Sequence, residues 1–129
     1  MAVFCFLGIL QDMEYVTYEE FKKMDMRVGT LISVEPVEGT DKLLKCQLDF
    51  GEKNEDGSPK LRQIVSGIRE SYPEFEQLIG KQILYIVNLE PRTIRGIESQ
   101  GMLMAVDGKD GKAVLMHPNN EVDPGVRIH

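Results

Sequence analysis

The most regular segment of this 129-residue chain reads Leu44-Lys45-Cys46-Gln47-Leu48-Asp49-Phe50. Apolar and polar residues alternate along it, which is the pattern of a β-strand with one face in a core and the other face in water. Residues 61–68 are its expected strand partner. The polar segment 51–59 between them contains glycine and proline, so we expect a solvated loop at the tip of the pair.

The segment before this pair also alternates with a period of two. A strand is predicted over 27–35, with Val28 and Ile32 on one face and Leu31 on the other. Pro36 should end this strand, because proline has no backbone N–H to donate to a neighbouring strand.

Two short helices are predicted from capping motifs. Thr17-Tyr18-Glu19-Glu20 places a hydroxyl and a carboxylate where they can satisfy free amides at a helix start, so we expect a helix to about Lys23. Ser71-Tyr72-Pro73-Glu74 repeats this pattern with proline in the first turn, and Gly80 supplies a C-terminal stop. The second helix is therefore expected over about 72–78.

The second half of the chain predicts further strands. Residues 83–87 are apolar on both faces, which is typical of a strand covered by the core on one side and by a helix or a partner subunit on the other. Residues 102–106 and 113–116 flank Asp107-Gly108-Lys109-Asp110-Gly111, a strong hairpin signal. Residues 126–128 are a candidate for a final short strand.

These elements amount to about five to seven short strands in a chain long enough for one core. The expected fold class is all-β, a five-stranded oligonucleotide-binding (OB) barrel with short helices and extra C-terminal strands. Met13 precedes the first patterned segment, so we expect one domain over 13–129 and an extension over 1–12 that the fold does not require. The apolar run 2–10 is half the length of a membrane helix, so no transmembrane segment is predicted.

Groups that could support catalysis or hold a cofactor are few. His117 and His129 stand apart from other candidate ligands. Cys5 and Cys46 form no CxxC motif or disulfide framework, which fits a reducing compartment and a cytoplasmic protein. Gly80-Lys81-Gln82 lacks the spacing of a phosphate-binding loop. The sequence therefore predicts no catalytic residue, no metal site and no cofactor.

The charge is acidic overall, with 15 Lys and Arg against 21 Asp and Glu and a net charge of -6. No global positive field attracts polyanions, so a nucleic-acid site would have to be local. Within 88–102, Arg92 and Arg95 lie among hydroxyl and amide side chains and glycines, the groups that bind phosphate and sugar. The residues alone also allow a polar loop with ordinary surface arginines.

The same segment carries a resemblance to a known family. It reads Asn88-Leu89-Glu90-Pro91-Arg92-Thr93-Ile94-Arg95-Gly96-Ile97-Glu98-Ser99-Gln100-Gly101-Met102 and resembles the signature of the tRNA-binding domain. That domain is found at the C-terminus of many methionyl-tRNA synthetases and as stand-alone homodimers. Three further segments agree in order and spacing: Phe21-Lys22-Lys23-Met24-Asp25-Met26-Arg27-Val28-Gly29, Asp41-Lys42-Leu43 and Arg62-Gln63-Ile64-Val65-Ser66-Gly67-Ile68.

The resemblance, over about 17–128, implies an OB barrel that recognises tRNA largely by shape and has no chemistry of its own. The expected function is a non-catalytic tRNA-binding module that acts in trans, as a stand-alone protein or as a partner (beta subunit) of methionyl-tRNA synthetase. The rival is a chaperone-like, export-related dimer with the same barrel that binds peptides, which the acidic charge favours. A homodimer is expected, because 83–87 and the segment around Tyr15, Tyr18 and Phe21 carry more apolar surface than one barrel covers.

The candidate RNA-binding residues are Lys42, Asn88, Arg92, Arg95, Ser99, Gln100 and Met102. The arginines can fork onto phosphates, and Ser99 and Gln100 can hydrogen-bond sugar or base edges. Met102 either lies against a ribose or base face or belongs to the core. Asn88 either caps backbone groups or reaches the ligand, and the resemblance assigns it to the RNA surface.

Overall fold

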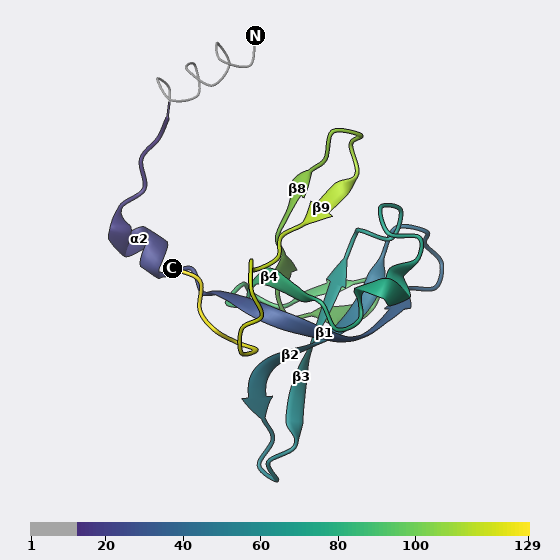
Figure 1. The fold of residues 1–129 in the computed structure, drawn as a ribbon, viewed down its shortest axis with the longest axis horizontal. Helices are drawn as coiled ribbons and strands as arrows, with labels where there is room; N and C mark the ends of the chain where they lie inside the picture. The colour runs from purple at the N-terminus through teal and green to yellow at the C-terminus, as the bar shows by residue number, and fades with distance from the viewer. Residues whose placement is uncertain (1–12) are drawn as a thin grey trace.

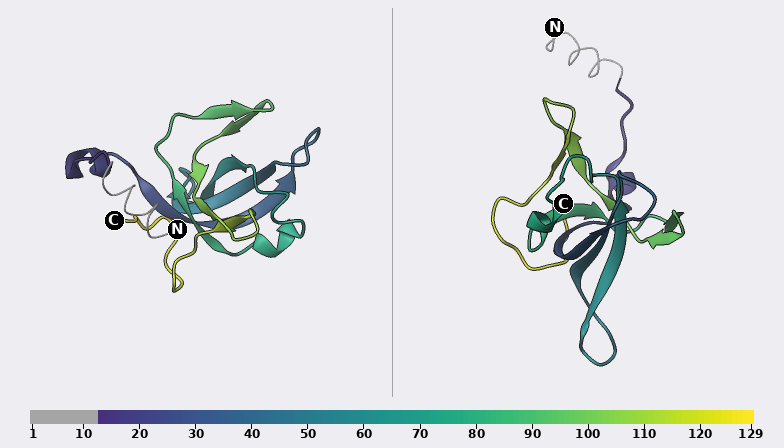
Figure 2. Two further views of the ribbon diagram at one scale, coloured as in Figure 1. Left: turned by 90° about the horizontal axis from the view of Figure 1, so that it is seen from above. Right: turned by 90° about the vertical axis from the view of Figure 1, so that its right-hand side faces the viewer.

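The structure of the protein is a computed structural model that describes residues 13–129. The expected extension over 1–12, with its apolar run, lies outside the described residues. Within 13–129 the chain is all-β with little helix, and its main sheet curls into an OB-like half-barrel, as the sequence predicts (Figures 1 and 2). None of the helices described is long and apolar enough to cross a membrane.

The main sheet has five antiparallel strands in the order β3-β2-β1-β4-β7. Their bounds are β1 Met26–Pro36, β2 Leu44–Lys53, β3 Pro59–Ser66, β4 Gln82–Ile86 and β7 Met102–Leu103. The long strand β1 lies at the centre of the order and pairs with β4 through its first half and with β2 through its second half. This division bends the sheet into a barrel.

The side chains of strand β1 are not divided between its two faces as the sequence predicts. The register of β1 against β2 shifts between Leu31 and Ser33, which marks a β-bulge. Leu31 is 1% exposed, whereas Ile32 is 43% exposed. Because a bulge adds one residue to one strand, side chains beyond it change face, and strict alternation along 27–35 fails there.

Strand β2 confirms the strongest sequence prediction, since Leu44, Cys46, Leu48 and Phe50 are all buried. The connection to β3 is shorter than predicted. The β2–β3 ladder extends to a pair between Lys53 and Pro59, and the Asn54 amide donates to the Ser58 carbonyl at 2.8 Å. The polar segment 51–59 is therefore partly strand, and the hairpin projects from the barrel as a narrow arm (Figure 1).

The first predicted helix is present as α2 Tyr18–Lys22, with Thr17 as its N-cap. The Thr17 hydroxyl accepts from the Glu20 amide at 3.1 Å, which confirms the capping motif. The second is only a single 3-10 turn, η1 Phe75–Leu78, without a side-chain cap. The Ser71 hydroxyl accepts from the Ala113 amide at 2.9 Å instead, so a tertiary partner takes the expected capping group.

The C-terminal part follows the predicted pattern with one difference. The strand expected over 102–106 is divided, because residues 102–103 belong to β7 of the main sheet and the hairpin strand begins only at Ala105. Strands β8 Ala105–Asp107 and β9 Ala113–Leu115 form the expected hairpin. The tail lies along β1 as a short bridge, in which the Val28 amide donates to Val126 and the Ile128 amide donates to Met26. Inside the barrel, the rings of Phe50 and Tyr85 meet edge to face with centroids 5.5 Å apart, a favourable aromatic geometry.

Candidate nucleic-acid interface

The arginine-containing segment forms a tight hairpin rather than an open loop. Strands β5 Arg92–Ile94 and β6 Ile97–Ser99 pair around a two-residue turn made by Arg95 and Gly96. Both turn residues have positive φ, 53° and 79°, as the preferred two-residue hairpin turn requires. Such positions favour asparagine, aspartate or glycine. Arg95 is the only non-glycine residue within 13–129 with positive φ.

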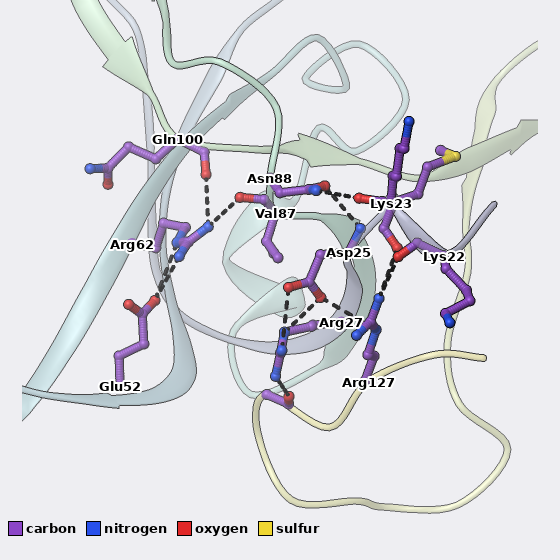
Figure 3. A network of polar contacts seen from close by, with 12 residues as sticks. Lys22, Lys23, Asp25, Arg27, Glu52, Arg62, Val87, Asn88, Gln100 and Arg127 are labelled. Carbon is purple, nitrogen blue, oxygen red and sulfur yellow. Dashed lines mark hydrogen bonds and ion pairs between the residues drawn. The ribbon is translucent and has the colours of Figure 1, made fainter. Parts of the chain in front are cut away.

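The two arginines of this hairpin are exposed. Neither Arg92 nor Arg95 forms an ion pair with any residue that the structure describes. Other arginines are engaged. Arg62 donates to Glu52, Val87 and Gln100, and both Arg27 and Arg127 reach Asp25 (Figure 3). The hairpin arginines are thus chemically available to an anionic ligand.

The Arg95 side chain at the hairpin tip reaches the loop between β1 and β2. Nη1 of Arg95 is 3.9 Å from the position that a Cβ atom on Gly39 would occupy. Lys42, in the same loop, is exposed and binds Thr40 only through its backbone amide. Figure 2 shows this hairpin and this loop projecting at one end of the barrel. The structure therefore brings Lys42 and Arg95 to the same region, although 52 intervening residues separate them in the sequence.

The sequence patterns did not identify Arg69 as a basic residue of this region. Nη1 of Arg69 donates to the Thr40 carbonyl at 3.0 Å, which places its guanidinium beside the same loop. The only available signal was its position directly after the family-like segment 62–68. A lone arginine after a strand has no periodicity or spacing that distinguishes it from a surface residue.

Ser99 and Gln100 occupy the seam that closes the barrel. The Ser99 hydroxyl accepts from the Val65 amide at 2.9 Å and donates to the Gly101 carbonyl at 3.3 Å. Gln100 bonds to Gln63 twice: its amide donates to the Gln63 carbonyl at 2.8 Å, and its Oε1 accepts from the Gln63 amide at 3.1 Å. Strand β3 and the β6–β7 segment are joined by these bonds.

The position of Ser99 in this seam differs from its expected role as an RNA contact. This residue is 4% exposed, and its hydroxyl is already engaged with two backbone groups of the barrel, so the contacts match a structural role. Gln100 keeps a free Nε2, which makes no hydrogen bond to residues 13–129. Gly101 permits the close approach, because a Cβ atom there would lie 2.9 Å from Ile64 and 3.0 Å from the Ile86 carbonyl.

Asn88 ties the N-terminal segment to the barrel (Figure 3). Its Oδ1 accepts from the Asp25 amide at 2.9 Å, and its Nδ2 donates to the Lys23 carbonyl at 2.6 Å. Of the two alternatives that the sequence left open, the contacts match the capping of backbone groups. The Met102 side chain is 46% exposed, so it does not belong to the core.

His117 is held by the fold, with Nδ1 2.6 Å from the Gln82 carbonyl. The described residues contain no cluster of three or more histidine, cysteine or acidic side chains that could hold a metal ion. A curled five-stranded sheet, with a hairpin at one end whose arginines form no ion pair within 13–129, defines a small binding domain of the OB type.

Comparison with known proteins identifies the family to which this OB-type domain belongs. Residues 26–127 match the family described as "Putative tRNA binding domain". The chain belongs to this tRNA-binding domain family, which confirms the resemblance inferred from its sequence motifs.

The curated relatives include methionine–tRNA ligases. That of Methanococcoides burtonii is 44% identical over 117 residues, which cover 90% of this chain and 16% of the ligase. That of Archaeoglobus fulgidus is 41% identical over 119 residues, covering 92% of this chain and 17% of the ligase. The chain thus spans about one sixth of the length of these relatives.

Solved structures of similar fold include two kinds of protein. A MetRS-related protein from Pyrococcus horikoshii superposes with a TM-score of 0.78 and 38% identity, covering 91% of this chain and all of that one. The chaperone CsaA from Bacillus anthracis superposes with a TM-score of 0.73 and 29% identity, covering 90% of this chain and all of that one. Both therefore match the present barrel over nearly its whole length.

Proposed function

We propose that this chain is a non-catalytic tRNA-binding module that acts in trans, as a stand-alone protein or as a partner of a methionyl-tRNA synthetase. Family membership supports tRNA as the ligand. Similarity to a region of methionine–tRNA ligases, and to a MetRS-related protein of the same length as this barrel, supports the link to the synthetase.

The observation that carries the proposal is Arg95 in its turn. A long cationic side chain occupies a backbone position that favours glycine or asparagine, and it lacks an ionic partner within 13–129. Backbone strain of this kind is concentrated at functional sites. The proposed RNA contacts are Lys42, Arg92, Arg95, Gln100 and Met102. Asn88 and Ser99 are proposed to position this surface rather than to touch RNA.

The test is a gel-shift titration with unfractionated tRNA. The Arg92→Ala/Arg95→Ala variant should lose at least about tenfold in affinity, because two phosphate contacts disappear. The control is Lys109→Ala/Lys112→Ala, which removes the same charge from the β8–β9 hairpin. Wild-type affinity in a folded arginine variant, or equal losses in both variants, would contradict the proposed RNA surface.

A second candidate function is the binding of unfolded polypeptide, as a chaperone. Similarity to CsaA chaperones and the net charge of -6 favour this alternative. A parallel titration with a permanently unfolded protein separates the two functions. Tighter binding to the polypeptide than to tRNA, insensitive to the arginine substitutions, would favour the chaperone function.

We also propose a homodimer, on a narrower basis than the sequence suggested. Ile83, Tyr85 and Ile86 of β4 are buried within a single chain, so this strand leaves little apolar surface for a partner. The N-terminal segment does have exposed apolar surface, because Tyr15 is 86% exposed and Tyr18 is 70% exposed. Light scattering should give twice the monomer mass, and Tyr15→Ser/Tyr18→Ser should shift the mass toward the monomer. A monomeric wild-type protein at micromolar concentration would contradict the dimer.

A further inference from the structure

We infer that Arg69 is a further phosphate-binding side chain, at a pocket beside the β1–β2 loop that extends the RNA surface beyond the β5–β6 hairpin. This inference rests on the proposed tRNA-binding function. The pocket has a volume of about 370 Å³ and is lined by Arg69 and by residues 36–41.

Arg69 is fixed to the loop at two points. Its backbone amide donates to the Lys42 carbonyl at 3.2 Å, and its Nη1 donates to the Thr40 carbonyl at 3.0 Å. The remaining guanidinium nitrogens, Nε and Nη2, make no hydrogen bond to residues 13–129. One side of the group is therefore held in place while the other can still donate two hydrogen bonds, the fork that fits a phosphate. Holding the group in advance reduces the entropy lost on binding.

Arg69 differs from the other half-buried arginines in its ion pairing. Arg27 is paired with Asp25, and Arg62 is paired with Glu52. Arg69 has no carboxylate within ion-pair distance among the described residues, although Glu38 and Asp41 also line the pocket. A partly desolvated guanidinium without a counter-charge is suited to an anion supplied by a ligand.

Two further cations lie around the same loop. Arg95 reaches Gly39 from the β5–β6 hairpin, and Lys42 directly follows the lining residue Asp41. The guanidinium groups of Arg69 and Arg95 thus approach Thr40 and Gly39 from two separate segments of the chain, and Lys42 belongs to the same loop. A bound RNA strand that contacts Arg95 would pass close to Arg69, so both side chains can contribute to one backbone-binding site.

The test compares Arg69→Gln with the control Lys109→Gln, which removes one charge from the turn of the separate β8–β9 hairpin. Affinity for unfractionated tRNA is measured by filter binding between about 50 and 200 mM salt. Arg69→Gln should weaken binding about three- to tenfold and reduce the salt slope by about 0.7 to 0.9, the share of one phosphate contact. Lys109→Gln should change affinity less than about twofold.

Two more variants distinguish the loss of a phosphate contact from a loss of loop structure. Arg69→Lys keeps the charge but loses the fork, and it should bind with intermediate affinity and an unchanged salt slope. Asp41→Asn removes a negative charge from the pocket and should tighten binding about twofold. Tighter binding through Asp41 is not a result that a damaged loop would give.

Specific outcomes overturn the inference. Wild-type affinity and slope in a folded Arg69→Gln protein would refute the role of Arg69 while leaving the tRNA-binding function intact. Equal losses in Arg69→Gln and Lys109→Gln would reduce the effect to net charge and refute it too. If the wild-type protein fails to bind tRNA at about 50 mM salt, the proposed function fails and the role of Arg69 fails with it.

Discussion

The Ser99 hydroxyl and the Val65 amide are joined by a buried hydrogen bond of 2.9 Å. Strand β3 is not paired with β6 or β7 by a regular ladder. A side-chain oxygen therefore serves a backbone N–H that would otherwise lack a partner at the seam of the barrel. A residue that looks like a ligand contact in the sequence is part of the closure that holds the arginine hairpin in place.

Replacing Ser99 by alanine should destabilise the protein. The Val65 amide would remain buried without an acceptor, at a cost of about 1–3 kcal/mol. Urea denaturation followed by circular dichroism measures this loss. Affinity for tRNA should fall with an unchanged salt slope, since no phosphate contact is removed.

Thr93→Ala, on the exposed face of the same hairpin, is the matched control and should leave the free energy of unfolding within about 0.5 kcal/mol of wild type. A Ser99→Ala protein as stable as wild type but weaker in tRNA binding would restore Ser99 as a direct RNA contact.

Replacing Arg95 by asparagine should separate stability from binding. Asparagine tolerates positive φ better than arginine does, so Arg95→Asn should stabilise the fold by about 1 kcal/mol. The same change removes a phosphate contact, and tRNA affinity should fall. Thermal unfolding and filter binding on one preparation measure both effects. Destabilisation by Arg95→Asn would show that the arginine side chain supports the turn.

Replacing Asn88 by alanine should loosen the N-terminal segment and leave the barrel intact. Both bonds of the Asn88 side chain go to backbone groups, at Lys23 and Asp25. Hydrogen exchange at the Asp25 amide should accelerate at least about tenfold, because its acceptor is lost. Amides of β2 should keep their protection. A large loss of tRNA affinity with the Asp25 amide still protected would instead make Asn88 a direct contact.

Stability should decline at alkaline pH because of two buried acidic groups. Burial raises the pKa of the Cys46 thiol to about 12. Burial, with a smaller effect of the nearby Cys46, also raises the pKa of the Tyr85 hydroxyl well above its usual value. In the unfolded chain these groups ionise near pH 8.5 and 10, roughly. The unfolded state therefore binds fewer protons than the folded state above these values, and the free energy of unfolding falls as pH rises.

The decline should begin near pH 9 and reach about 1.4 kcal/mol per pH unit for each group that is ionised only in the unfolded chain. Urea midpoints at pH 7, 9 and 10.5 measure it. Cys46→Val keeps an apolar side chain of similar size and should flatten the first part of the decline, between about pH 9 and 10. A Cys46→Val protein with the wild-type pH profile would exclude the thiol as its source.

Local patterns determined much of this protein. Strand β2 follows from the alternation of Leu44, Cys46, Leu48 and Phe50, because burying one face of a strand imposes a period of two. The start of α2 follows from Thr17, because a cap and its amide lie within one turn of each other. Family motifs in fixed order likewise identified the OB-like fold.

Only the tertiary structure decided the roles of polar groups with distant partners. The Ser71 hydroxyl serves Ala113 rather than a helix, and the Ser99 hydroxyl serves Val65. Arg69 and Arg95 belong to different segments, and they share the loop at Gly39 and Thr40 only because the barrel closes between them. Hydrogen bonds and ion pairs depend on distances of a few ångströms, which spacing along the chain does not fix once the partners lie on different strands.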